Sequence, residues 1–120
     1  MWRVHIKIRE TGIILFCEDY DSVLKFYSEK IGLNIRQFGE GLSILDFGGS
    51  YLMIESKGIA SNREKTRAEN PIVIRFNVNN FDSAVSELKA RGVKVDVKKF
   101  DWGIIGIVID PEGNRIEIKD

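Results

Sequence analysis

The chain has 120 residues, of which 43% are hydrophobic and 30% charged, and its 18 basic and 18 acidic side chains give a formal net charge of +0. This length and balance predict one globular domain, residues 1–120. Zero net charge lacks the basic excess typical of a nucleic-acid binder and argues against a polybasic membrane-surface protein, so we expect neither nucleic acid nor membrane as a partner. No apolar run approaches the roughly 20 residues that span a bilayer, so we expect a cytoplasmic protein.

The chain contains one cysteine, Cys17, and one histidine, His5. A single cysteine cannot form an internal disulfide, which fits a reducing compartment. The pair also excludes a zinc cluster built from cysteine and histidine. We interpret His5 as a surface or strand-end residue rather than a metal ligand.

The first predicted module covers about residues 10–56. Alternating residues from Gly12 to Cys17 predict a strand covered on both faces. Asp21 or Ser22 is the expected N-cap of the helix that follows, and Gly32 ends it. Three strands then follow at about 34–39, 42–48 and 50–56, with tight glycine turns between them.

A segment with few apolar residues, 57–70, predicts a mobile linker. The second module, residues 71–120, repeats the order of the first. Its helix is capped near Asp82 and ends at Gly92, and strands are expected at about 94–99, 102–110 and 114–119. The stretch Asp110-Pro111-Glu112-Gly113 has the residue order of a tight turn.

The two modules are similar in sequence. A shift of about 61 positions lays Asp21-Ser22 on Asp82-Ser83, and a shift of about 64 lays Met53 on Glu117. The sequence therefore predicts an α+β fold of two βαβββ modules, each a small sheet with one helix on one face. The uncovered faces can close on each other or on a partner chain and leave a cleft.

Two segments carry a resemblance to a known family: DSVLKFYSEKIGL at 21–33 and DPEGNRIEI at 110–118. Together with the internal repeat, they make residues 10–119 similar to the vicinal oxygen chelate superfamily of glyoxalases, bleomycin-resistance proteins and extradiol dioxygenases. The resemblance implies paired βαβββ modules that form a cupped mixed sheet. It also implies a homodimer.

Metal-using members of that superfamily place histidine and glutamate ligands at four points, at the start of each first strand and on each fourth strand. Carried over to this chain, the points are Gly12, Met53, Val73 and Glu117. Only Glu117 matches, so we expect no metal and no cofactor. A two-carboxylate metal site of Glu55 and Glu117 is the alternative that remains open.

Strand alternation places Arg75 and Glu117 on the uncovered face of the second module. Arg75 is therefore expected to face Glu117 or Glu55. A charge in a cleft is tolerated mainly when it is paired. Either the pair only stabilises the strand face, or Arg75 orients an anionic or carbonyl-bearing ligand by its forked donors.

Apolar and aromatic residues are expected beside these charges, from Ile14, Phe16, Tyr51, Met53, Trp102 and Ile104. Apolar walls with a few polar anchors are typical of small-molecule sites, although strand aromatics are also common in cores. The predicted ligand-binding set is Phe16, Tyr51, Met53, Arg75, Trp102 and Glu117.

Two functions follow from these observations. The first is a metal-independent small-molecule-binding protein. The second is a lyase or isomerase acting on a small oxygenated substrate, with non-standard metal ligands or with Glu117 or Glu55 as a base of raised pKa. No nucleophile signal or glycine-rich phosphate loop favours other chemistry.

Overall fold

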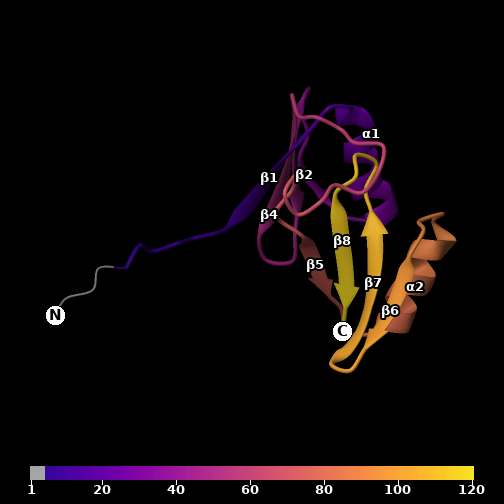
Figure 1. Cartoon of the computed structure of the whole chain (residues 1–120). Coiled ribbons are helices and arrows are strands. Elements are labelled where there is room, and N and C mark those ends of the chain that lie inside the picture. Colours follow the sequence, from indigo (N-terminus) through magenta and orange to yellow (C-terminus); the bar gives the residue numbers. More distant parts are fainter. Residues whose placement is uncertain (1–4) are drawn as a thin grey trace.

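The computed structural model describes residues 5–120 and contains two βαβββ modules (Figure 1). Module one consists of β1 (Gly12–Cys17), α1 (Tyr20–Lys25), η1 (Phe26–Ile31), β2 (Ile35–Gln37), β3 (Leu42–Asp46) and β4 (Tyr51–Ser56). Module two consists of β5 (Ile74–Asn77), α2 (Phe81–Ala90), β6 (Asp96–Phe100), β7 (Gly103–Ile109) and β8 (Arg115–Lys119). The predicted fold class is confirmed.

Each module forms a four-stranded mixed sheet with the same topology. The order is β1-β4-β3-β2 in sheet one and β5-β8-β7-β6 in sheet two. The first strand of each module pairs in parallel with the fourth, and the remaining pairs are antiparallel. Ile14 lies opposite Met53 and Arg75 lies opposite Glu117. The register therefore confirms the repeat, since Met53 and Glu117 occupy equivalent positions.

Both helices begin about two residues earlier than the sequence suggests. Asp19 accepts a hydrogen bond from the amide of Ser22, and Asn80 accepts one from the amide of Ser83. The side chain of an N-cap residue accepts a hydrogen bond from the backbone amide three residues later. Asp19 and Asn80 therefore cap the helices, and the predicted caps Asp21 and Asp82 do not. The second half of the first helix is a π-helix that ends at Gly32, whose φ of 93° suits glycine.

The core lies between each sheet and its helix. Val23, Leu24 and Tyr27 are buried in module one, and Val85 and Leu88 in module two. We call the opposite side of each sheet its open face. Ile14 and Phe16 lie on the open face of sheet one, and both are 49% exposed. The expectation that β1 is covered on both faces is therefore wrong for the single chain.

One strand residue faces the other way from the prediction. Ile107 lies opposite Glu117 and Gly106 lies opposite Ile118, so alternation puts Ile105, not Ile104, on the open face of sheet two. Ile104 instead packs against the helix-side core. The prediction for Ile104 was wrong because the β6–β7 hairpin determines which residues of β7 face each side of the sheet. The sequence pattern alone does not show this.

The turn between β7 and β8 joins the modules. The carboxylate of Asp110 closes this turn by accepting hydrogen bonds from the amides of Glu112 and Asn114, and it also accepts one from the Tyr27 hydroxyl at 2.7 Å. Glu112 is 2% exposed, and its carboxylate accepts hydrogen bonds from the amides of Glu18 and Asp19. The turn therefore caps the entry to α1, as the adjacent segments in Figure 1 show.

Segment 57–70 is fixed along this turn rather than free of the modules. The amides of Ser61 and Lys65 donate to the carbonyls of Glu112 and Gly113. A side chain at Gly113 would overlap the carbonyl of Arg63, so the segment packs closely on the turn. The prediction of a mobile linker rested on composition, which does not reveal these backbone bonds.

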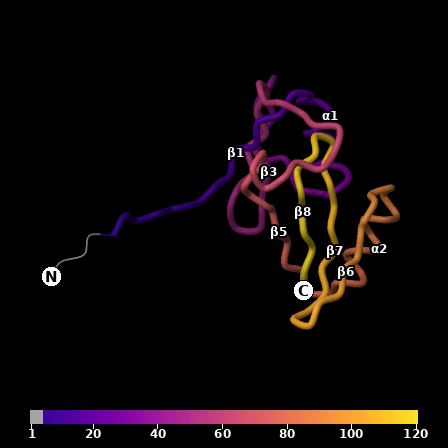
Figure 2. Tube along the Cα trace, in the orientation of Figure 1, coloured from indigo at the N-terminus to yellow at the C-terminus, as the bar shows by residue number. Residues whose placement is uncertain are grey.

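Residues 5–9 extend away from the two modules (Figure 2). Their apolar side chains are solvent-exposed, with Ile6 at 86% and Ile8 at 68%. His5 is also exposed, as expected. Within residues 5–120, no helix combines the length and the apolar character that crossing a bilayer requires.

Candidate functional site

Glu117 lies between two arginines on the open face of sheet two. One carboxylate oxygen, Oε1, accepts hydrogen bonds from Nη2 of Arg75 at 2.7 Å and from its Nε at 3.2 Å. The other, Oε2, accepts one from Nε of Arg115 at 3.0 Å. The predicted Arg75–Glu117 contact is therefore present, and Arg115 is a second partner that the prediction missed. Its place two residues before Glu117 on the same strand was the available signal.

The two guanidinium groups set the acidity of Glu117. Partial burial acts to raise the pKa of this carboxyl group, but hydrogen bonds from Arg75 and Arg115 and their positive charges outweigh it. The net pKa of Glu117 is lowered. A general base that works near neutral pH needs a raised pKa, so this environment favours a permanently ionised anchor.

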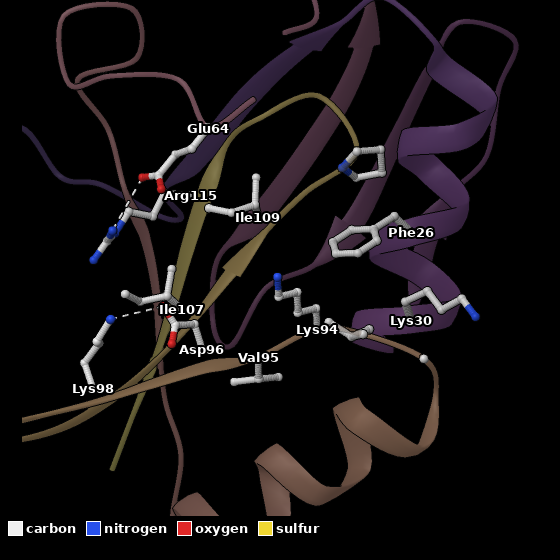
Figure 3. Close-up of a pocket in the computed structure, with 13 residues that line it drawn as sticks. Phe26, Lys30, Glu64, Lys94, Val95, Asp96, Lys98, Ile107, Ile109 and Arg115 are labelled. Carbon is white, nitrogen blue, oxygen red and sulfur yellow. Dashed lines mark hydrogen bonds and ion pairs between the residues drawn. The ribbon is translucent and has the colours of Figure 1, made fainter. Parts of the chain in front are cut away.

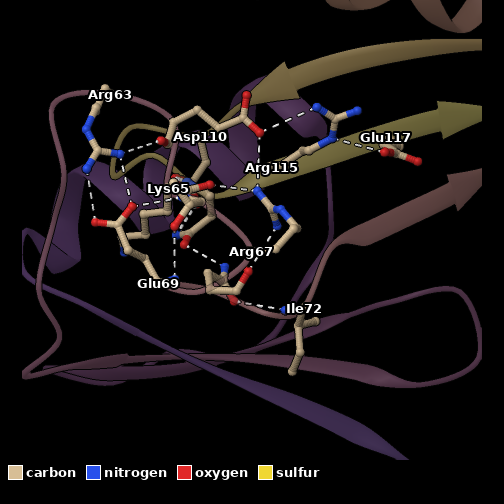
Figure 4. Close-up of polar contacts among 12 residues, drawn as sticks. Arg63, Lys65, Arg67, Glu69, Ile72, Asp110, Arg115 and Glu117 are labelled. Carbon is tan, nitrogen blue, oxygen red and sulfur yellow. Dashed lines mark hydrogen bonds and ion pairs between the residues drawn. The ribbon is translucent and has the colours of Figure 1, made fainter.

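The charged network continues into the segment between the modules (Figure 4). Nη1 of Arg115 lies 3.4 Å from Oε2 of Glu64, which also accepts a hydrogen bond from Nη2 of Arg67 at 3.2 Å. Glu64 is thus shared between two arginines. The side chains of Arg75 and Arg67 are each 43% exposed, whereas that of Glu117 is only 12% exposed.

The start of β1 and of β4 in module one has different chemistry. Tyr51 lies opposite Gly12 in register, and a Cβ added at Gly12 would overlap the Tyr51 ring. The ring thus fills the space that a side chain at position 12 would need. The guanidinium carbon of Arg36 lies 5.9 Å from the centre of the same ring, and Arg36 pairs with Glu10 and Asp46.

These residues do not fit a divalent metal of the kind the superfamily uses. Such a metal needs several nitrogen or oxygen ligands. Gly12, Met53 and Val73 offer none, and both oxygens of Glu117 already accept guanidinium hydrogen bonds. Residues 5–120 contain no group of three or more histidine, cysteine, aspartate or glutamate side chains arranged to hold a metal.

The alternative site of Glu55 and Glu117 also lacks support. Glu55 lies on sheet one, opposite Phe16 and Leu42. Glu117 lies on sheet two, opposite Arg75 and Ile107. The two carboxylates therefore belong to different sheets, and each is flanked by residues of its own sheet.

The remaining predicted residues fall into two places. Phe16, Tyr51 and Met53 share the open face of sheet one, since each lies opposite another residue of that face. Trp102 lies in the β6–β7 hairpin, where its ring stacks on Phe100 with centroids 4.9 Å apart. Nζ of Lys119, from the open face of sheet two, lies 5.9 Å from the Trp102 ring. The predicted set is therefore split between the sheets.

A cavity of about 790 Å³ lies beside the Glu117 cluster, between the first helix and the open face of sheet two (Figure 3). Sequence reasoning missed it because its walls come from both modules. Its apolar lining includes Phe26, Val95, Ile107, Ile109 and Pro111, and its charged lining includes Lys30, Glu64, Lys94, Asp96, Lys98 and Arg115. Arg115 thus belongs both to this cavity and to the Glu117 cluster.

Two buried titratable groups, Cys17 and Tyr27, have raised pKa values. Burial and the nearby carboxylates of Glu112, Asp110 and Asp19 raise the pKa of the Cys17 thiol to about 11. Burial also raises the pKa of Tyr27, whose hydroxyl donates to Asp110. A thiol of high pKa is a poor nucleophile, in agreement with the absence of a nucleophile signal in the sequence.

Solved structures with this fold are similar along nearly the whole chain. A glyoxalase/bleomycin resistance protein/dioxygenase from Alicyclobacillus acidocaldarius has a TM-score of 0.75 and 20% identity, covering 91% of this chain and 88% of its own. A protein of the same description from Nocardioides has a TM-score of 0.74 and 15% identity, covering 96% and 84%. A lactoylglutathione lyase from Agrobacterium tumefaciens has a TM-score of 0.68 and 16% identity, covering 89% of each chain.

Sequence comparison gives the same family. The glyoxalase domain-containing protein RDO1 of Mycosarcoma maydis is 26% identical over 117 residues, which cover 88% of this chain and 64% of that protein. The chain therefore spans less than two thirds of the length of this relative. Residues 4–118 match the family described as the Glyoxalase/Bleomycin resistance protein/Dioxygenase superfamily. The chain belongs to this superfamily.

Proposed function

We propose that this protein binds a small organic molecule at the open face of sheet two without using a metal. The observation that carries the proposal is the engagement of both Glu117 oxygens by guanidinium groups. A carboxylate held in this way is unsuited to coordinate a metal unless an arginine is displaced. It instead fixes Arg75 and Arg115 in place, which keeps their remaining N–H donors oriented towards a ligand.

The surroundings of the cluster support binding. Arg75 remains 43% exposed, so its guanidinium is accessible to a carbonyl or anionic group. Ile107 lies opposite Glu117 on the same face and supplies apolar area. Apolar walls with a few fixed polar donors are the common composition of small-molecule sites.

The enzymatic alternative is less well supported. The lowered pKa of Glu117 makes it a weak base, and Glu55 lies on the other sheet. The lactoylglutathione lyase among the similar structures shares the fold at 16% identity, which does not extend its activity to this chain. A reaction catalysed here would need a base or ligand outside these two carboxylates.

We also propose that the protein is a cytoplasmic homodimer. The open face of sheet one exposes Ile14 and Phe16, and the cost of wetting apolar area is about 25 cal/mol per Å². A second copy of the chain could cover this face with one of its own open faces. The single buried thiol of Cys17 fits a reducing location.

The binding proposal can be tested by ligand-observed NMR against a library of small organic fragments, with chelator present throughout. Amide shifts should map the hits to β7 and β8. Arg75→Met should weaken the hits, and Lys89→Met, an exposed cation on α2, should not. A protein that binds no fragment under these conditions, or binds only after a divalent metal is added, would contradict the proposal.

A further inference from the structure

We propose that the cavity between the modules binds an amphipathic anion, a molecule with an apolar body and one carboxylate or similar acidic group. This inference rests on the proposed function, since it names the place and the chemical class of the ligand. The cavity volume of about 790 Å³ lies within the roughly 300–1,000 Å³ typical of small-molecule sites.

Apolar side chains from both modules form the walls against which the apolar part of the ligand would pack. Ile107 and Ile109 come from the open face of β7, and Phe26 comes from η1 of the other module. Figure 3 shows Phe26 and Ile109 bordering the same space from opposite sides. An aliphatic chain or ring placed there would be removed from water on both sides, which is the main favourable term in binding such molecules.

The charges around the cavity favour an anion. Four basic side chains line it, Lys30, Lys94, Lys98 and Arg115, against two acidic ones, Glu64 and Asp96. Both acids are already paired: Glu64 lies within 3.4 Å of Arg115, and Asp96 lies 3.5 Å from Lys98. The lining therefore carries two more positive than negative charges.

Lys94 is the cation best placed to hold the acidic group. Lys30 donates to the carbonyl of Arg91, whereas Lys94 has no hydrogen bond or ion pair with any described residue. Figure 3 shows its ammonium pointing into the cavity between Phe26 and Ile109. An anion bound there gains a charge-assisted hydrogen bond without first breaking an existing pair.

Arg115 provides a second donor, which Glu64 partly occupies. Its Nε is held by Glu117, while Nη1 reaches Glu64 at the longer distance of 3.4 Å. Removing the Glu64 charge would release this end of Arg115 towards the cavity. Glu64→Gln should therefore strengthen anion binding, although it removes an ion pair from the protein.

The test uses three probes of equal chain length: octanoate, octanol and octylammonium, titrated into the full chain by calorimetry with chelator present. Octanoate should bind most tightly and octylammonium least. Lys94→Met should weaken octanoate about tenfold and leave octanol unchanged, as expected for the loss of one charge-assisted hydrogen bond. Lys89→Met is the matched control, because Lys89 is an exposed cation outside the cavity.

The outcomes separate the two proposals. If octanol binds as well as octanoate and Lys94→Met affects neither, the ligand class is wrong while small-molecule binding stands. If octanoate binds but causes amide shifts only around Phe16 and Met53, the location is wrong. If neither these probes nor the fragment library bind, the proposed function itself fails.

Discussion

At the scale of single residues, the site is defined by which side chains occupy the four superfamily positions. Tyr51 fills the space above Gly12, and two arginines occupy the oxygens of Glu117. The Tyr51 ring fills the space at Gly12, and the two arginines neutralise the charge of Glu117, so neither position needs a metal. The position that keeps a carboxylate therefore serves as the centre of an ion cluster.

The first prediction concerns the coupling of Arg75 and Glu117. Glu117→Ala should lower the free energy of unfolding by about 1–2 kcal/mol, because two arginines lose their partner in a partly wet site. Arg75→Met in that background should recover part of the loss. Urea unfolding of the double-mutant cycle measures the coupling, which should be about 0.5–1 kcal/mol.

The control for this cycle pairs Arg75→Met with Glu55→Ala. Glu55 was the other carboxylate that the sequence allowed as a partner, and it lies on the other sheet. Its coupling to Arg75 should be indistinguishable from zero. A coupling larger than that of Glu117 would mean that the open faces are assigned incorrectly.

At the scale of elements, the modules are joined by the β7–β8 turn. The Glu112 carboxylate accepts hydrogen bonds from Glu18 and Asp19 at the start of α1, at 2.8 and 2.6 Å. These amides precede the first helical turn and have no helical carbonyl to bond. A single buried carboxylate thus couples the second module to the fold of the first.

Replacing Glu112 should therefore be costly. Glu112→Gln replaces one acceptor oxygen by an NH2 group, a donor that faces a backbone N–H. We therefore expect a loss of about 2–3 kcal/mol in the free energy of unfolding. Chemical denaturation measures it, with Glu40→Gln as an exposed control of the same chemistry. A loss no larger than that of the control would show that the turn does not secure the modules.

The segment between the modules should make stability depend on pH. Hydrogen bonds from Arg63 and from the Thr66 amide lower the pKa of Glu69 to about 2 from the ordinary 4.5. Ionised Glu69 therefore stabilises the folded chain above about pH 4.5, and this contribution is lost as the pH falls towards 2. Glu69→Gln should be less stable than the parent at neutral pH.

The thermal midpoints of the two proteins, measured from neutral to acidic pH, check this prediction. The difference between them should shrink through the same window and vanish near the folded pKa. A constant difference across the range would assign the effect of the substitution to packing rather than to the Glu69 charge.

At the scale of the whole molecule, the open face of sheet one leaves apolar residues exposed in the single chain. We predict a dimer at micromolar concentration in sedimentation velocity, and Phe16→Asp should shift the equilibrium towards monomer. Val97→Asp, an exposed position on the edge strand β6, is the control. A monomer that shows no concentration dependence would favour a chain that functions alone.

The fold was predictable from the sequence because it depends on local patterns. The alternation of residues along the chain predicted the strands, and the repeat of module one in module two predicted the topology. The glycines at 48 and 49 both adopt positive φ, as a two-residue hairpin turn requires. Arg75 pairs with Glu117 because β5 and β8 are adjacent, and strand alternation predicted that both side chains share one face.

The contacts of Glu112 and the cavity between the modules could not be predicted, because they depend on segments far apart in the sequence. The partners of Glu112 lie more than 90 positions away, at 93 and 94 residues. The cavity combines Phe26 with Ile107 and Lys94, from opposite modules. Side-chain periodicity within one element does not reveal such combinations, since they are set by how the modules pack.

Whether the protein works without a metal can be measured by titrating the native chain with Zn²⁺, Ni²⁺ and Mn²⁺ in a calorimeter. We predict no saturable site with a dissociation constant tighter than about 1 mM, because the superfamily positions retain one carboxylate and two arginines hold it. One equivalent of tightly bound metal per chain, lost in Glu117→Gln, would mean that Glu117 is a metal ligand and that binding depends on a metal.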